Sequence, residues 1–249
     1  MYKIFKELLL TAVILFCAGF IYGRISAAGP QTDYFNSHWR TTLDRTPVLR
    51  QILGLHDNGD ARSDYLGSRF SSIYITVNAV YDVTVDTAVL DRFAAAVRDV
   101  TGKPASYRVV YNNISQTDLS DDDVAGIFNR YHSPIPSGAA SLTVLIADTH
   151  QNEPNLLGST FQEYGIVMYK KTLEGFTSAA PSTLGNYELS TLLHEFGHQI
   201  GLGHNNIPGC LMNSQAEQNN AAITDPAFVV TDFCQPELEQ INMQKALSQ

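Results

Sequence analysis

The segment His194–His204 constrains this chain more than any other part of it. It reads His-Glu-Phe-Gly-His-Gln-Ile-Gly-Leu-Gly-His, and the apolar residues around it recur at helical spacing. Residues four apart lie one turn apart on the same face of a helix, so His194 and His198 can reach one metal ion. Glu195 is rotated about 100° from His194 around the helix, so it can approach a water on that metal without being a ligand.

A glycine and a third histidine complete the pattern. Gly201 follows His198 by three residues, where a helix needs a left-handed residue in order to stop and turn. The turn would bring His204 back as a third nitrogen ligand. Three histidines with one open position are typical of a catalytic zinc site rather than a closed structural one. A core helix with incidental histidines would not explain where Gly201 and His204 fall.

This pattern resembles the long signature of the metzincin clan of zinc peptidases and matches it at every fixed position. Members of the clan carry a methionine-containing turn beneath the zinc, and residues 209–213 are the candidate, with Met212 as an apolar floor. Asn205, which follows the third histidine, matches none of the common subfamily residues. Ser214 stands where some subfamilies have an additional tyrosine ligand. The resemblance implies a zinc endopeptidase whose subfamily stays open.

The N-terminus has the pattern of an export signal. Lys3 and Lys6 precede an apolar run of 15 residues over 8–22, and small residues at 26–28 favour cleavage after position 28. This run is shorter than the roughly 20 residues of a membrane span. We therefore expect a cleaved signal peptide over residues 1–28 and a secreted or extracytoplasmic protein. The second choice is an uncleaved membrane anchor through residues 8–22.

Charge and cysteine content bear on partners and compartment. Removal of residues 1–28 takes away three basic residues and one acidic residue, so the net charge falls from −9 to −11. So acidic a chain, with no basic patch in its sequence, is unsuited to nucleic acid. Cys210 and Cys234 would remain, in a compartment that permits disulfides. We expect them to form a disulfide that ties the Met212 turn to the last helix, with two free buried thiols as the alternative.

Residues 29–69 are less regular, and we expect an N-terminal extension here. The acidic stretch over 57–64 is rich in turn residues, but its spacing fails the calcium-loop pattern, and the sequence leaves structural calcium open. The alternative is an inhibitory pro-segment. It contains no cysteine, so the residue that takes the open zinc position would be Asp57, Asp60 or Asp64.

From residue 70 onward, alternating strand and helix patterns predict an α+β fold. A run of β-branched and aromatic residues predicts a strand at 72–81, and further strands are predicted at 107–111 and at the apolar run 141–147. Two shorter candidates follow at 158–161 and 165–169. Helices are predicted over 86–100, after Ser120, from about residue 186 through the histidines, and from Pro236. The order resembles a metzincin-like zincin catalytic domain over residues 70–249. Such a domain has a mixed twisted sheet, an active-site helix, a methionine turn and a C-terminal helix.

The resemblance implies an exported endopeptidase that hydrolyses peptide bonds with one catalytic zinc ion. His194, His198 and His204 would hold the zinc, and its bound water would be the nucleophile. Glu195 would be the general base. An extended peptide or protein substrate binds well along an exposed strand edge. The residues expected to contact it are Gly158, Ser159, Thr160 and Phe161.

Two alternatives remain open. One keeps the zinc without the peptidase, as a zinc-binding surface or adhesion module or as a hydrolase of another amide. Glu195 argues against the module, because a structural zinc needs no base beside an open coordination position. The other is a membrane-anchored surface protein whose enzymology is incidental. The sequence specifies neither the natural substrate and cleavage specificity nor the oligomeric state.

Overall fold

The computed structural model describes residues 2–29, 33–131, 135–214 and 229–249. The chain divides into two compact units, Met1–His56 and Asp57–Gln249. The first unit begins with helix α1 (Tyr2–Ala27), whose segment Ile4–Ala27 is long and apolar enough to cross a membrane. The helix exceeds the apolar run seen in the sequence because residues 2–7 and 23–27 extend it at its two ends. A signal sequence and a membrane anchor share this character.

Short helices complete the first unit. They are the π-helix η1 (Asn36–Arg40), α2 (Thr41–Leu43) and α3 (Pro47–Leu53). Pro47 occupies the first turn of α3, where its missing N–H would have no helical partner in any residue. The proline therefore begins a helix at this point, and Gly54 ends it with a left-handed φ of 71°.

The second unit is built on a mixed sheet, in which the described residues form five strands in the order β2-β1-β4-β7-β6. The strands are β1 (Ser72–Ala79), β2 (Ala105–Tyr111), β4 (Ala139–Ala147), β6 (Gly158–Phe161) and β7 (Gly165–Tyr169). Four of them are parallel, and β6 runs antiparallel to β7 at the edge. Every predicted strand is confirmed, with bounds that differ by a few residues.

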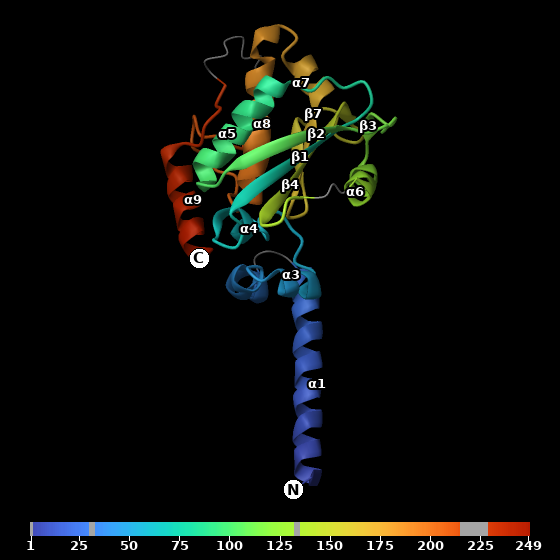
Figure 1. Cartoon of the computed structure of the whole chain (residues 1–249), viewed down its shortest axis with the longest axis vertical. Helices are drawn as coiled ribbons and strands as arrows, with labels where there is room; N and C mark the ends of the chain where they lie inside the picture. Colours follow the sequence, from blue (N-terminus) through green and yellow to red (C-terminus); the bar gives the residue numbers. More distant parts are fainter. Residues whose placement is uncertain (1, 30–32, 132–134, 215–228) are drawn as a thin grey trace. The chain divides into compact units, whose positions relative to one another are not determined.

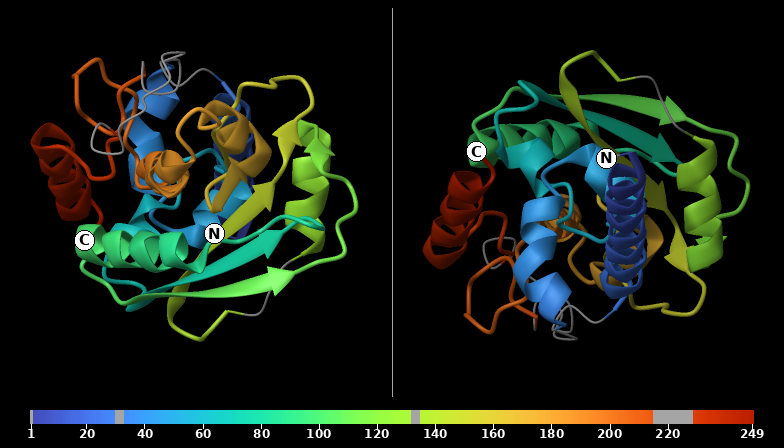
Figure 2. Two further views of the ribbon diagram at one scale, coloured as in Figure 1. Left: turned by 90° about the horizontal axis from the view of Figure 1, so that it is seen from above. Right: turned by 90° about the horizontal axis from the view of Figure 1, so that it is seen from below.

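Two long helices cover one face of this sheet. α5 (Thr87–Thr101) and α8 (Leu184–Gln199) pack side by side against it (Figure 1). Phe93 of α5 and Phe196 of α8 meet edge to face, with ring centroids 6.2 Å apart. Figure 2 looks nearly along α8 and shows the C-terminal helix α9 (Gln235–Leu247) on the outside of the unit.

Shorter elements join these layers. They are α4 (Arg62–Leu66), β3 (Asp118–Leu119), α6 (Asp121–Arg130), β5 (Thr149–His150), α7 (Lys170–Phe176) and the 3-10 helix η2 (Pro181–Thr183). β3 and β5 pair in parallel as a small second sheet. Ser120 caps α6 through a capping box with Asp123, as the predicted helix start requires.

Residues 57–69 pack into the second unit. Tyr65 is only 1% exposed, and its hydroxyl donates a hydrogen bond to the Ser141 carbonyl of β4 over 2.9 Å. Its ring meets Phe196 of α8 edge to face, with 5.8 Å between centroids. The second unit, which starts at Asp57, therefore includes residues 57–69 as well as the segment from residue 70 onward.

Candidate active site

Helix α8 presents His194 and His198 in its last turns and ends at Gln199. Gly201 follows with a φ of 87°, a conformation that costs glycine little. Its N–H donates to the His198 carbonyl over 3.0 Å, and the Leu202 N–H donates to the Gly197 carbonyl over 2.9 Å. The chain therefore turns where the sequence predicts, and it returns His204 toward the helix.

The three imidazoles converge on one point. His204 Nε2 lies 3.1 Å from His194 Nε2 and 3.2 Å from His198 Nε2. Zinc–nitrogen bonds of about 2.1 Å at tetrahedral angles place two ligand nitrogens about 3.4 Å apart. The three Nε2 atoms are thus spaced closely enough to share a single zinc ion.

The other ring nitrogens also suit a metal. His194 Nδ1 lies 2.8 Å from the Leu211 carbonyl oxygen, and His198 Nδ1 lies 2.9 Å from that of Leu202. A ring nitrogen that faces a carbonyl must carry the proton, so the Nε2 atoms of both rings carry lone pairs. Lone pairs that converge on one point in this way suit coordination of a shared metal ion. The donor set therefore fits zinc.

Met212 lies buried under α8, and the sequence analysis missed the residue that allows this. Gly197 stands between the two helical histidines, and a Cβ there would lie 2.4 Å from Met212 Sδ. The methionine can approach α8 only because this side chain is absent. A glycine inside a helix costs about 1 kcal/mol against alanine, so its presence was a signal that something packs closely there.

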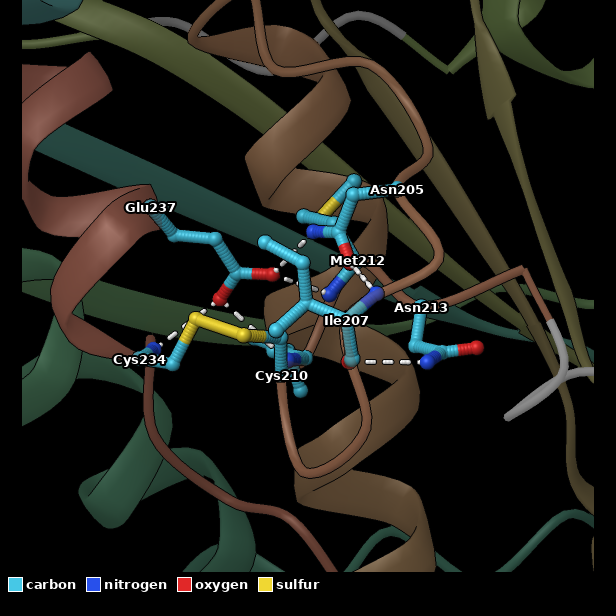
Figure 3. Close-up of a disulfide and its surroundings, with 8 residues drawn as sticks. Asn205, Ile207, Cys210, Met212, Asn213, Cys234 and Glu237 are labelled. Atoms are coloured by element: carbon cyan, nitrogen blue, oxygen red, sulfur yellow. Dashed lines mark hydrogen bonds between the residues drawn. A yellow bond between two sulfur atoms is a disulfide. The ribbon is translucent and has the colours of Figure 1, made fainter.

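The predicted disulfide is confirmed. Cys210 and Cys234 are joined, with 5.0 Å between their Cα atoms, and they link the methionine turn to the start of α9 (Figure 3). Glu237, beside this disulfide, is a second residue that the sequence analysis missed. The signal for it was an acidic residue directly after the proline that begins the predicted helix, in the first turn, where carboxylates cap helix N–H groups.

The edge strand β6 begins directly against α8. A Cβ on Gly158 would lie 2.5 Å from Thr191 Cγ2 and 3.2 Å from Glu195 Cγ. Gln199, which the sequence analysis also missed, donates two hydrogen bonds from Nε2. One goes to the Gln162 carbonyl over 3.0 Å, and the other goes to the Gly165 carbonyl over 2.8 Å. Strand β6 therefore runs along the helix that carries the histidines, and it is held there at both ends.

Tyr169 ends β7 in the neighbourhood of Glu195. Burial raises the pKa of its phenol to about 12, and the nearby carboxylates of Asp121, Glu153 and Glu195 also raise it. The phenol therefore stays neutral at physiological pH, and it adds no negative charge beside Glu195.

A buried ion pair joins the first residue of α7 to α8. Lys170 donates to the carboxylate of Glu188, and both side chains are almost fully enclosed. Burial raises the pKa of Glu188, and the Lys170 ammonium opposes that shift. Two charges taken out of water in this way depend on each other, because either alone would be strongly disfavoured.

The acidic stretch at residues 57–64 packs against the turn at Gly201. A Cβ on Gly59 would lie 3.2 Å from Gly201 Cα. Asp60 accepts a hydrogen bond from the Asp57 N–H over 2.8 Å within its own loop, and Asp64 lies in α4. These contacts describe a packed loop, and an inhibitory role for these aspartates stays an untested alternative.

Comparison with known proteins places this geometry in a family. The reprolysin-like metallo-peptidase family M12B matches residues 60–243. Archaemetzincin AmzA from Methanopyrus kandleri is 15% identical with a TM-score of 0.55, over 71% of this chain and 97% of its own. Metalloproteinase-II from Bacteroides fragilis is 10% identical with a TM-score of 0.46, over 71% of this chain and 53% of its own. Among curated proteins there is no match.

The family match covers most of the second unit, including the three histidines, the methionine turn and the first part of α9. The likeness to the Methanopyrus archaemetzincin confirms the predicted α+β metzincin-like fold. The chain therefore belongs to the reprolysin-like M12B metallopeptidase family and is a zinc metallopeptidase of the metzincin type.

Proposed function

We propose that the protein is an exported endopeptidase whose zinc ion is held by His194, His198 and His204, with Glu195 as general base. The observation that carries this is the convergence of the three Nε2 atoms, 3.1 and 3.2 Å apart, next to a buried glutamate on the same helix. When bound, zinc would lower the pKa of a water molecule and polarise the scissile carbonyl.

The chain's own residues supply the proton transfers and the support. Glu195 accepts a proton from the attacking water and then donates it to the leaving amine. Its burial beside Gly158 holds the carboxylate next to the strand along which substrate would lie. Met212 packs beneath the ligands as an apolar floor and takes no part in proton transfer.

The backbone groups of β6 point alternately toward β7 and away from the sheet, and this alternation supports a substrate on the outer edge of β6. The Tyr169 N–H donates to the Leu157 carbonyl, and antiparallel pairs exchange hydrogen bonds at alternate residues. Ser159 and Phe161 therefore direct their backbone groups toward β7, whereas Gly158 and Thr160 direct theirs away from the sheet. An extended peptide can add a strand at this edge. We propose that Gly158, Ser159, Thr160 and Phe161 form that substrate-binding edge.

Replacing Thr160 by proline is expected to lower kcat/KM for a peptide about fivefold, with unchanged zinc content. Proline removes an outward N–H, and one hydrogen bond contributes about 1 kcal/mol. Thr160→Ala is the matched control, because it keeps the backbone donor. Peptide kinetics and metal analysis of both variants provide the measurement. Equal kcat/KM in the two would place the substrate elsewhere.

Export is supported by the apolar helix α1 and by the disulfide between Cys210 and Cys234. Because Tyr65 belongs to the core of the second unit, any processing that keeps this unit intact should cut before Asp57. Mass spectrometry of the mature N-terminus is expected to find a chain that starts after residue 28. An N-terminus that still contains residues 8–22 would support the membrane anchor instead.

The proposed activity is tested by incubating the purified mature protein with a diverse peptide library, with and without a zinc chelator. Internal cuts that the chelator abolishes are the expected result. Stoichiometric zinc with no cleavage would favour the zinc-binding module or a hydrolase of another amide. The positions of the cuts would report the specificity that the sequence leaves open.

A further inference from the structure

We infer that Glu237 is a positioning residue for the zinc site, acting through the methionine turn and through the residue that follows the third histidine. The inference rests on the proposed zinc ligands. Glu237 lies in the first turn of α9, far in sequence from the histidines, and its side chain is 2% exposed. A carboxylate so deeply buried requires hydrogen-bond donors around it.

Within the described part of the chain, four N–H groups from three segments surround this carboxylate (Figure 3). Oε1 accepts from the Met212 N–H over 2.7 Å and from Asn205 Nδ2 over 2.8 Å. Oε2 accepts from the Leu211 N–H over 3.2 Å and from the Cys234 N–H over 3.0 Å. An ionised carboxylate has about four acceptor positions, so this set uses its full capacity.

These donors lead directly to two of the proposed ligands. The Leu211 carbonyl, which accepts the proton on His194 Nδ1 over 2.8 Å, belongs to the same peptide group as the Met212 N–H that donates to Glu237. Asn205 directly follows His204, and its backbone N–H donates to the Met212 carbonyl over 2.8 Å. The carboxylate therefore holds both the acceptor that orients the His194 ring and the segment that carries His204. Partners of this kind fix the ring orientation of metal-binding histidines.

Helix capping alone does not account for this arrangement. A carboxylate at the third helical position ordinarily accepts from its own helix start, and here the Cys234 N–H supplies that bond. The other donors belong to residues 205–212, on the side of the ligands. The disulfide already joins the same two segments covalently. What the carboxylate adds is the orientation of the Leu211 and Met212 peptides and of Asn205.

The test is the zinc affinity of Glu237→Gln, measured by competition with a chromophoric chelator. The amide has nearly the same shape, but it replaces one acceptor oxygen with an NH2 group that would face N–H donors. The dissociation constant for zinc is expected to rise about 10- to 100-fold, the usual effect of losing such a partner. Glu239→Gln is the matched control, because Glu239 lies exposed on the same helix and accepts from Gln235. The control should bind zinc like the wild type.

A second variant separates positioning from general destabilisation. Asn205→Ala removes the Nδ2 donor that joins Glu237 to the residue after His204, together with the acceptor of the Ile207 N–H, and keeps α9 and the disulfide. It should also weaken zinc binding, and it replaces Glu237→Gln if that chain does not fold. Thermal unfolding of the metal-free proteins shows whether the fold itself has suffered. Wild-type zinc affinity in both folded variants would overturn the inference and leave the proposed function standing. Failure of the wild type itself to bind zinc would overturn both.

Discussion

Replacing Glu195 by alanine is expected to lower peptide turnover by about 10²-fold or more, while the protein keeps about one zinc ion per chain. The magnitude is the usual loss on removal of a general base. The zinc should remain because the three nitrogen ligands are untouched and because His194 and His198 keep their hydrogen bonds to backbone carbonyls. Peptide turnover and atomic absorption on the same preparation provide the measurement.

Replacing His204 by alanine serves as the contrasting variant. It removes the nitrogen that lies 3.1 and 3.2 Å from the other two, and a pair of helical histidines with water holds zinc far less well. This variant should lose both metal and activity, whereas Glu195→Ala should lose activity alone. Wild-type turnover in Glu195→Ala would show that the proposed mechanism is wrong.

The parts of the fold that could be predicted from the sequence are those determined by patterns among residues close together in the chain. The histidines are brought together by helical spacing and by one left-handed glycine, which act within eleven residues. The central strands of the main sheet are runs rich in apolar and β-branched residues. The disulfide followed from export and from two remaining cysteines. None of these required knowledge of which distant segments meet.

The residues that sequence reasoning missed make contacts between distant segments. Gly197 matters because Met212 packs beneath it, and Gln199 matters because its amide reaches the carbonyl of Gln162 in the β6–β7 turn. Glu237 joins α9 to residues 205–212. The core position of Tyr65 depends on the approach of β4 and α8. The spacing of residues along the chain does not indicate which distant segments make contact. An isolated glycine or acidic residue in a helix can nevertheless indicate that such a contact exists.

The buried pair of Lys170 and Glu188 gives the largest expected effect on stability. Replacing Lys170 by methionine leaves the Glu188 carboxylate enclosed without its ammonium partner. Breaking one side of a buried ion pair typically costs about 3–5 kcal/mol of unfolding free energy. Urea unfolding followed by circular dichroism measures this loss. Tryptophan fluorescence would not, because the single tryptophan, Trp39, lies in the first unit.

Two comparisons make this prediction specific. Lys171→Met changes an exposed neighbour and should alter the unfolding free energy by less than about 0.5 kcal/mol. Adding Glu188→Leu to Lys170→Met should recover much of the loss, because apolar side chains need no compensating charge. If Lys170→Met is no less stable than Lys171→Met, the pair contributes nothing to the fold.

The loss should also depend on pH. Without Lys170, burial would raise the pKa of Glu188 in the folded chain further, and the charges of Asp86 and Glu174 act in the same direction. A carboxyl group whose folded-state pKa exceeds its unfolded value, about 4.3, binds more protons when folded. Stability then falls as pH rises from the unfolded toward the folded pKa. The difference between wild type and Lys170→Met should therefore be smaller at pH 5 than at pH 8, and the opposite trend would contradict a buried, unpaired carboxylate.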